Sequence, residues 1–245
     1  MNVLEVQGLT KHYPAFTLNG VSFAVPEGAV MGFIGRNGAG KSTTLKSILG
    51  MVHPDAGEVK VFGMDYAANE RAIRRELGVV LGGIDFYPKK KIRVITDVTR
   101  RFYDNWDESK YRHYLRLFAI DEEKRVDQLS SGMKVKYMIA LALSHNAKLL
   151  ILDEPTSGLD PVSRDELAEL LRRIVADGTR SVLFSTHITS DLEKCATQIA
   201  FIKDGELQYT GSLEDFRAHY KDVGTTLEDI IVHVERRPLD EDAIL

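Results

Sequence analysis

The stretch Gly35–Thr43 reads GRNGAGKST and fits the pattern G-x-x-x-x-G-K-[ST]. It follows the apolar run AVMGFIG and leads into a segment, Lys41 to about Leu49, that is predicted to be helical. Glycines at this spacing let successive backbone N–H groups turn inward around phosphates, and the positive end of the following helix points at the same anion. Lys41 can reach the β- and γ-phosphates, and the Ser42 hydroxyl can ligate Mg²⁺. The residues expected around the phosphates are Gly35, Asn37, Gly38, Ala39, Gly40, Lys41, Ser42 and Thr43. The alternative is a glycine-rich turn with an incidental lysine.

A second apolar run ends in two carboxylates. The segment KLLILDEP, residues 148–155, is predicted to be a buried strand that stops at Asp153 and Glu154. Open α/β sheets bind ligands at the carboxyl ends of such strands. Asp153 suits a metal ion, directly or through water, and Glu154 suits a general base that acts on an attacking water. The alternative is an acidic strand end that caps a neighbouring helix.

The pattern of hydrophobic and charged residues changes twice along the chain. Short strand-like runs such as VLEVQGL and GEVKVFG dominate the first third, and their alternation predicts an antiparallel, half-exposed sheet. From Phe86 to Ser144 the chain is richer in charged and aromatic residues and has helical spacing. Strand–helix alternation then returns, which predicts a parallel sheet with covering helices. From Ser212 the chain has two more short helical patterns and a polar end.

Composition narrows the classes of function. The chain has 245 residues, of which 44% are hydrophobic, and its net charge of -4 argues against tight nucleic-acid binding. The only cysteine, Cys195, fits a reducing compartment and is interpreted as an inert thiol. The longest apolar runs are far too short to cross a bilayer. We therefore expect a soluble protein that has a membrane role only through a partner.

Four further elements make the chain resemble one family, the ATP-binding-cassette ATPases. Tyr13 stands where that family has an aromatic residue that stacks on adenine. The segment LSSGMK, residues 129–134, resembles the family signature LSGGQ. SGLD, residues 157–160, resembles the dimer-contacting loop, and His187 in FSTH resembles the switch histidine. By themselves, Tyr13 and His187 are more often structural residues, but all these elements occur in the family's order.

The residue chemistry agrees with this resemblance. Ser130 precedes an apolar-periodic helix and can cap it, which leaves free N–H groups aimed at an anion. Asp160 and Pro161 form another helix start, with an Asp cap and a proline in the first turn. His187 can hydrogen-bond the γ-phosphate and the attacking water. The residues that the resemblance adds to the ATP site are Tyr13, Ser130, Ser131, Gly132, Asp160 and His187.

The resemblance implies an α/β fold with a P-loop NTPase core, an antiparallel β subdomain and an inserted α-helical subdomain. We expect the core with the β subdomain in residues 1–83 and 146–211, the helical subdomain in 84–145, and a helical tail in 212–245. The implied activity is Mg²⁺-dependent ATP hydrolysis, with Lys41, Glu154 and His187 as the catalytic residues. The implied partners are a second ATP-binding subunit and a transmembrane permease, on the cytoplasmic face of the membrane and of exporter type. The rival function is a soluble cassette ATPase without a permease, for example in iron–sulfur cluster assembly.

The chain also departs from the family pattern. Ser131 replaces a glycine of the signature, and Met133 replaces its glutamine. After LGVVL, where the family places a metal-contacting glutamine, this chain has Gly82 and Gly83. We expect a water molecule to take the place of that ligand; the alternative is that Asp85 swings in as a substitute.

Overall fold

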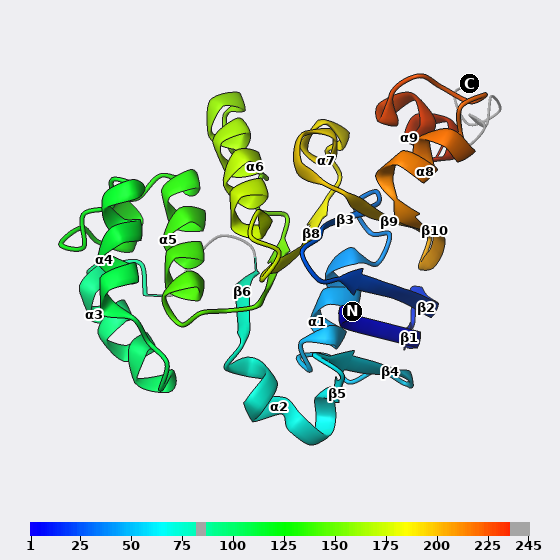
Figure 1. The fold of residues 1–245 in the computed structure, drawn as a ribbon. Coiled ribbons are helices and arrows are strands. Elements are labelled where there is room, and N and C mark those ends of the chain that lie inside the picture. Colours follow the sequence, from blue (N-terminus) through cyan, green and yellow to red (C-terminus); the bar gives the residue numbers. More distant parts are fainter. Residues whose placement is uncertain (82–86, 236–245) are drawn as a thin grey trace.

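Two sheets organise the computed structural model, which describes residues 1–81 and 87–235 (Figure 1). The first is antiparallel and has the strand order β2-β1-β4-β5. The second has the order β10-β9-β3-β8-β7-β6, with its strands parallel except for β10. The strands are β1 (Asn2–Tyr13), β2 (Phe16–Pro26), β3 (Val30–Ile34), β4 (Ala56–Val61), β5 (Met64–Asp65), β6 (Leu77–Leu81), β7 (Leu149–Asp153), β8 (Ser181–Thr186), β9 (Gln198–Lys203) and β10 (Glu206–Ser212).

Helices cover these sheets and form a group of their own. They are α1 (Lys41–Ile48), α2 (Tyr66–Arg74), α3 (Ile92–Thr99), α4 (Glu108–Leu117), α5 (Ser131–Ser144), α6 (Pro161–Val175), α7 (Thr189–Cys195), α8 (Leu213–His219) and α9 (Leu227–Glu235), with 3₁₀ turns η1 (Arg100–Phe102) and η2 (Val126–Gln128). Among the described residues, no helix combines the length and the apolar character that crossing a bilayer requires.

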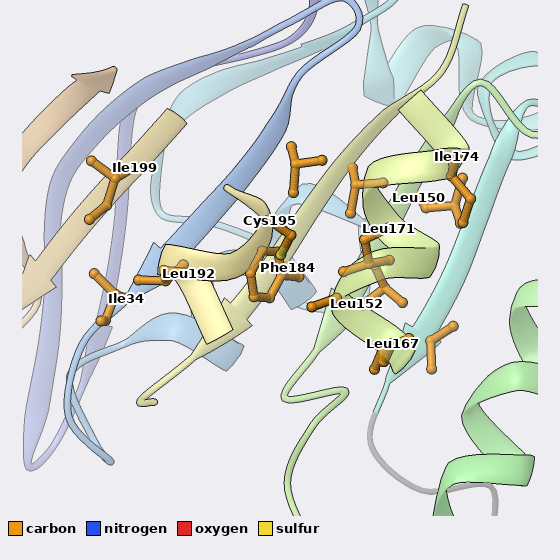
Figure 2. Close-up of a cluster of buried hydrophobic side chains, with 14 of the residues drawn as sticks. Ile34, Leu150, Leu152, Leu167, Leu171, Ile174, Phe184, Leu192, Cys195 and Ile199 are labelled. Atoms are coloured by element: carbon orange, nitrogen blue, oxygen red, sulfur yellow. The ribbon is translucent and has the colours of Figure 1, made fainter. Parts of the chain in front are cut away.

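The parallel strands are buried on both faces, as their continuous apolar sequences predict. On one face, Leu150 and Leu152 of β7 and Phe184 of β8 pack with Leu167 and Leu171 of α6 (Figure 2). On the other face, the sheet packs against α1 and against the inner side of the antiparallel sheet. The large sheet is therefore a rigid middle layer, and its strand ends are fixed platforms for the loops that follow.

The helices α3, α4 and α5 form a separate group that has its own hydrophobic core. Ile92 and Ile95 of α3 pack with Tyr111 of α4 and Tyr137 of α5, and the hydroxyls of both tyrosines bond the buried Thr96. Trp106 packs against this cluster. We propose on this basis that residues 84–145 form the helical subdomain, of which 87–145 are described. The predicted fold class, an α/β core with an antiparallel sheet and inserted helices, is confirmed.

Candidate functional site

Three loops with predicted site residues leave the same edge of the six-stranded sheet. β3, β8 and β7 are parallel neighbours in that order. The phosphate loop follows β3, Glu154 follows β7, and His187 follows β8. Open α/β sheets bind ligands at this edge, outside the carboxyl ends of the strands. The strand order thus brings together residues that lie more than a hundred positions apart in the chain.

The phosphate loop runs from Gly35 to the start of α1 at Lys41. Gly38 and Gly40 have φ values of 84° and 113°, a region that residues with a side chain rarely adopt. The Lys41 side chain is 6% exposed, and its Nζ donates to the carbonyl oxygens of Gly35 at 2.7 Å and Arg36 at 3.2 Å. The loop therefore holds a buried ammonium group beside the N-terminal end of a helix, an arrangement that suits an anion.

The Glu154 carboxylate contacts both Lys41 and His187. Its Oε1 lies 3.1 Å from Lys41 Nζ, and its Oε2 lies 2.9 Å from His187 Nδ1, which donates to it. Its backbone has φ 49°, which is strained for a residue other than glycine and costs on the order of 1–3 kcal/mol. Strain of this kind persists where the surroundings fix the residue. The carboxylate is thus held in one place, with a cation on one oxygen and an imidazole on the other.

Ser185 of β8 links Asp153 to Glu154. Its hydroxyl donates to Asp153 Oδ1 at 2.5 Å and accepts from the backbone N–H of Glu154 at 2.9 Å. The same hydroxyl therefore orients the predicted metal ligand and the predicted base. Motif reasoning did not single out Ser185, although it lies two residues before His187 in the FSTH segment.

A cavity of about 400 Å³ opens above the phosphate loop. Lys41, Ser42, Thr43 and Glu154 line it, together with Asn37 and Gly38. Its wall offers an ammonium group, a hydroxyl and the N-terminal end of α1, which are the donors that a triphosphate needs. The Ser42 hydroxyl and the Asp153 carboxylate are oxygen ligands of the type that Mg²⁺ prefers. The residues present therefore fit ATP with Mg²⁺.

Two aromatic residues stand at the turn between β1 and β2. Phe16 lines the cavity, and its ring would lie 3.0 Å from a Cβ placed on Gly40. Tyr13, the predicted adenine platform, pairs with Phe16 in the strand register and is 41% exposed, but it is not among the residues that line the cavity. The stacking role of Tyr13 stays a prediction, and Phe16 is a lining residue that the motifs did not indicate.

The signature segment begins α5 as predicted. Ser130 caps the helix by accepting from the backbone N–H of Met133 at 3.2 Å, and Ser131 and Gly132 form its first turn. None of these three residues lines the cavity above the phosphate loop. Asp160 caps α6 in the same way, with Pro161 in the first turn. The N-terminal end of α5 therefore lies apart from the cavity above the phosphate loop.

Cys195 and two exposed lysines make contacts within the chain that do not involve the cavity, and three further residues lie outside the described part of the chain. Cys195 is buried in the main core, and burial raises the pKa of its thiol to about 12, which agrees with an inert thiol. Lys89 pairs with Asp127, and Lys91 pairs with Glu123, at exposed positions. Gly82, Gly83 and Asp85, on which the question of the missing glutamine depends, lie outside the described residues.

Comparison with known proteins finds a matching family model and similar sequences. Residues 18–157 match the family model described as "ABC transporter". The chain is 31% identical over 208 residues to the bacitracin transport ATP-binding protein BcrA of Bacillus licheniformis, covering 84% of this chain and 68% of that protein. It is 35% identical over 208 residues to the Nod factor export ATP-binding protein I of Burkholderia orbicola, covering 82% and 68%.

A solved structure has the same architecture across nearly the whole chain. It is described as the structure of an ATP-binding subunit of an ABC transporter, and it superposes with a TM-score of 0.84 at 29% sequence identity. The match covers 96% of this chain and 100% of that one.

Proposed function

We propose that this chain, which belongs to the ABC transporter family, works as one of two paired ATP-binding subunits that power a separate membrane-spanning permease. Membership makes the chain an ATPase that is related to transport ATP-binding proteins. The observation that carries the proposal is the cluster of Lys41, Glu154 and His187 beside the phosphate loop. The proposed dimerisation and the proposed docking to a permease are supported by two other features of the structure.

The cluster supports a division of labour in ATP hydrolysis. Lys41 and the loop amides would bind the β- and γ-phosphates and stabilise the negative charge that develops on them. Glu154 would orient a water molecule and accept its proton, while His187 would hold Glu154 and the γ-phosphate in register. Ser42 and Asp153 would hold the Mg²⁺ ion, which neutralises phosphate charge when it is bound.

Pairing is supported by the place of the signature segment. The free N–H groups at the start of α5 are a site for an anion, but Ser130, Ser131 and Gly132 do not line their own subunit's cavity. A second copy can present this helix end to the γ-phosphate held by the first. Asp160, at the start of α6, would lie at the same contact. We therefore propose that two subunits enclose two ATP molecules and separate after hydrolysis.

A permease is supported by a cleft between α2 and η1. A cavity of about 590 Å³ is lined by Arg71, Arg74, Arg75 and Arg101, and by Phe102, whose side chain is 72% exposed. Arg74 and Arg75 have ion-pair partners, in Glu70 and Asp104. Within the described ranges, Arg71 and Arg101 make no ion pair. The cleft therefore has unbalanced positive charge next to an exposed aromatic ring.

The cleft continues into an apolar cavity of about 470 Å³ at the edge strand β6. Arg74 and Tyr103 line both cavities, and the second also contains Leu49, Met51 and Leu81. A segment with acidic residues on one side and apolar residues on the other would match this surface. We propose that the permease provides that segment, so that movement of the core is passed to the membrane.

Charge reversal in the cleft tests this proposal. The chain would be expressed together with any multi-span protein that is encoded beside it, and a complex of the two would be purified from detergent-solubilised membranes. Arg71→Glu combined with Arg101→Glu should reduce recovery of the complex at least about tenfold, since like charges would then face each other. The ATPase activity of the isolated subunit should stay within about twofold, because neither residue lines the ATP cavity.

The matched control is Arg112→Glu combined with Arg116→Glu on the exposed side of α4. It makes the same change in net charge and should leave the complex intact. Equal loss of the complex in both double variants would contradict the cleft as the docking surface. If the parent chain binds no multi-span protein, the result would support the rival function, that of a soluble assembly ATPase. The relative named for Nod factor export favours export over import as the direction of transport.

A further inference from the structure

An ion pair joins the starts of α6 and α7, two helices that pack against each other (Figure 1). Arg164 of α6 donates from Nε and Nη2 to Oδ1 of Asp191 in α7, at 3.0 and 2.6 Å. Its Nη2 also donates to the Ser190 hydroxyl at 3.1 Å. Because the guanidinium group is planar and its donors are fixed, these three bonds set the direction as well as the distance of the contact.

This pair is a poor way to stabilise the fold. Asp191 is 2% exposed, and its Oδ2 has no hydrogen-bond partner among the described residues. A buried carboxylate with one unbonded oxygen is costly, and apolar side chains of similar size would often hold two helices together as well or better. Stability alone therefore does not account for the pair, and its surroundings indicate another role.

The pair lies next to the turn that carries His187. The chain leaves β8 at Thr186 and reaches Asp191 only five residues later. Within this turn, the N–H of Ile188 donates to the Thr186 hydroxyl at 3.0 Å, and the N–H of Asp191 donates to the carbonyl oxygen of Ile188 at 3.3 Å. The turn is thus held to β8 at one end and, through Arg164, to α6 at the other.

The start of α6 also lies against the start of α5. A Cβ placed on Gly132 would be 3.5 Å from the Ser163 side chain and 3.8 Å from Leu159. Asp160, which caps α6, is part of the proposed subunit contact, and its carbonyl oxygen accepts from the N–H of Arg164 at 3.0 Å. The first turns of α6 therefore touch the signature segment on one side and hold the turn after β8 on the other.

We propose that Arg164 is a positioning residue that links the pairing of two subunits to His187. It holds the start of α7 against α6, so that His187 keeps its contact with Glu154 when α6 is set at the subunit contact. Pairing is in this way passed to the residue that acts beside the γ-phosphate. This inference rests on the roles proposed above for His187 and for the subunit contact.

Two double variants test the proposal. Arg164→Met with Asp191→Asn removes the pair without leaving a buried charge alone, so the fold should be kept. Asp165→Asn with Lys194→Met is the control, because these residues form a second ion pair between α6 and α7, at 2.9 Å and at exposed positions. The full chain would be used, and kcat, the KM for ATP and the melting temperature would be measured.

Removing the Arg164–Asp191 pair should lower kcat at least about fivefold and leave the KM for ATP within about twofold, because a misplaced His187 affects the chemical step and not the phosphate loop. In protein with isotope-labelled histidine, the NMR signal of the His187 ring would be assigned by its absence in His187→Gln. This signal should move more than those of the other histidines. The control should match the parent chain in every measurement.

Several results would overturn the proposal. An unchanged kcat would leave the pair as a packing feature. A lower kcat with an unmoved His187 signal would show that Arg164 acts by another route, and a KM that rises as much as kcat falls would point to the phosphate loop. Equal losses in the control would show that any loosening of α6 against α7 is sufficient.

Pairing would be measured separately, in a Glu154→Gln background with ATP and Mg²⁺. Removing the Arg164–Asp191 pair should leave the amount of dimer unchanged, because the pair acts after the subunits meet. Loss of the dimer would place Arg164 in the subunit contact itself and overturn the link to His187. Failure of the proposed function would be seen differently: Glu154→Gln alone would form no dimer, whereas the shift of the His187 signal requires no partner.

Discussion

Replacing Glu154 with glutamine separates the chemical step from the binding of ATP. The side chain keeps nearly the same shape, so its neighbours Ser185 and His187 need not move. What changes is the charge: the carboxylate, 3.1 Å from Lys41 Nζ and 2.9 Å from His187 Nδ1, becomes a neutral amide that cannot take a proton from water. Binding of a triphosphate should not suffer, because Lys41 loses a competing negative partner.

The expected loss follows from the role of a general base. Such a group typically contributes a factor of about 10²–10⁴, or roughly 3–5 kcal/mol of activation free energy. Glu154→Gln should therefore lower kcat at least about 100-fold, while the Kd for ATP stays equal or falls. A chain that binds ATP but cannot hydrolyse it should stay paired. Size-exclusion chromatography with ATP and Mg²⁺ should show a dimer that the parent chain holds only briefly.

The control is Glu166→Gln on α6, which neutralises another carboxylate paired with a lysine, at 2.5 Å from Lys136 and outside the cavity. It should leave kcat and the dimer population unchanged. A kcat for Glu154→Gln within about tenfold of the parent value would refute the assignment of Glu154 as the base, since it lies below the range for that role. Weaker ATP binding would refute the view that Glu154 competes with phosphate for Lys41.

Two further predictions concern adenine and acid pH. Tyr13→Ala should weaken ATP binding by roughly 5- to 150-fold, the equivalent of about 1–3 kcal/mol of stacking, with little change in kcat; a larger loss in Phe16→Ala would make Phe16 the platform. His145 stacks on Tyr103 and bonds the carbonyl oxygen of Arg75, and burial lowers its pKa to about 4. The unfolded chain therefore binds a proton at His145 more readily than the folded chain does. The free energy of unfolding should not depend on His145 titration well above pH 6.5, and it should be lower by about 2 kcal/mol at pH 5. Urea titrations should show a smaller fall in His145→Gln, and an equal fall would contradict this account.

The parts of the site that the sequence predicted are those that depend on local backbone geometry. The phosphate loop needs glycines that adopt positive φ, and Gly38 and Gly40 do so. The helix starts at Ser130 and Asp160 need a side chain that accepts from an N–H two or three residues ahead, and both residues supply it. In each case the cause lies within a few residues of the effect, so a short stretch of sequence is sufficient.

The parts that the sequence did not predict depend on strand order. β8 lies between β3 and β7, which places the Ser185 hydroxyl against Asp153 and His187 against Glu154. The sequence indicated each strand, but the lateral order of the strands follows from packing across the whole sheet. Phe16 escaped notice for the same reason, since it reaches the cavity only because the antiparallel sheet packs beside β3.

The contacts of Lys41 depend both on the local backbone of the phosphate loop and on the order of the strands. A lysine ammonium that is 6% exposed is costly unless it has partners, and here the loop supplies two carbonyl oxygens and β7 supplies the Glu154 carboxylate. The γ-phosphate would approach the same ammonium, so the group that balances the lysine charge is also the group placed next to the reacting phosphorus. The surroundings hold Glu154 in a strained backbone conformation, with φ of 49°, and this conformation directs the carboxylate to the shared position. A more relaxed backbone would let the side chain leave the cluster, and Lys41 would lose its partner together with the base.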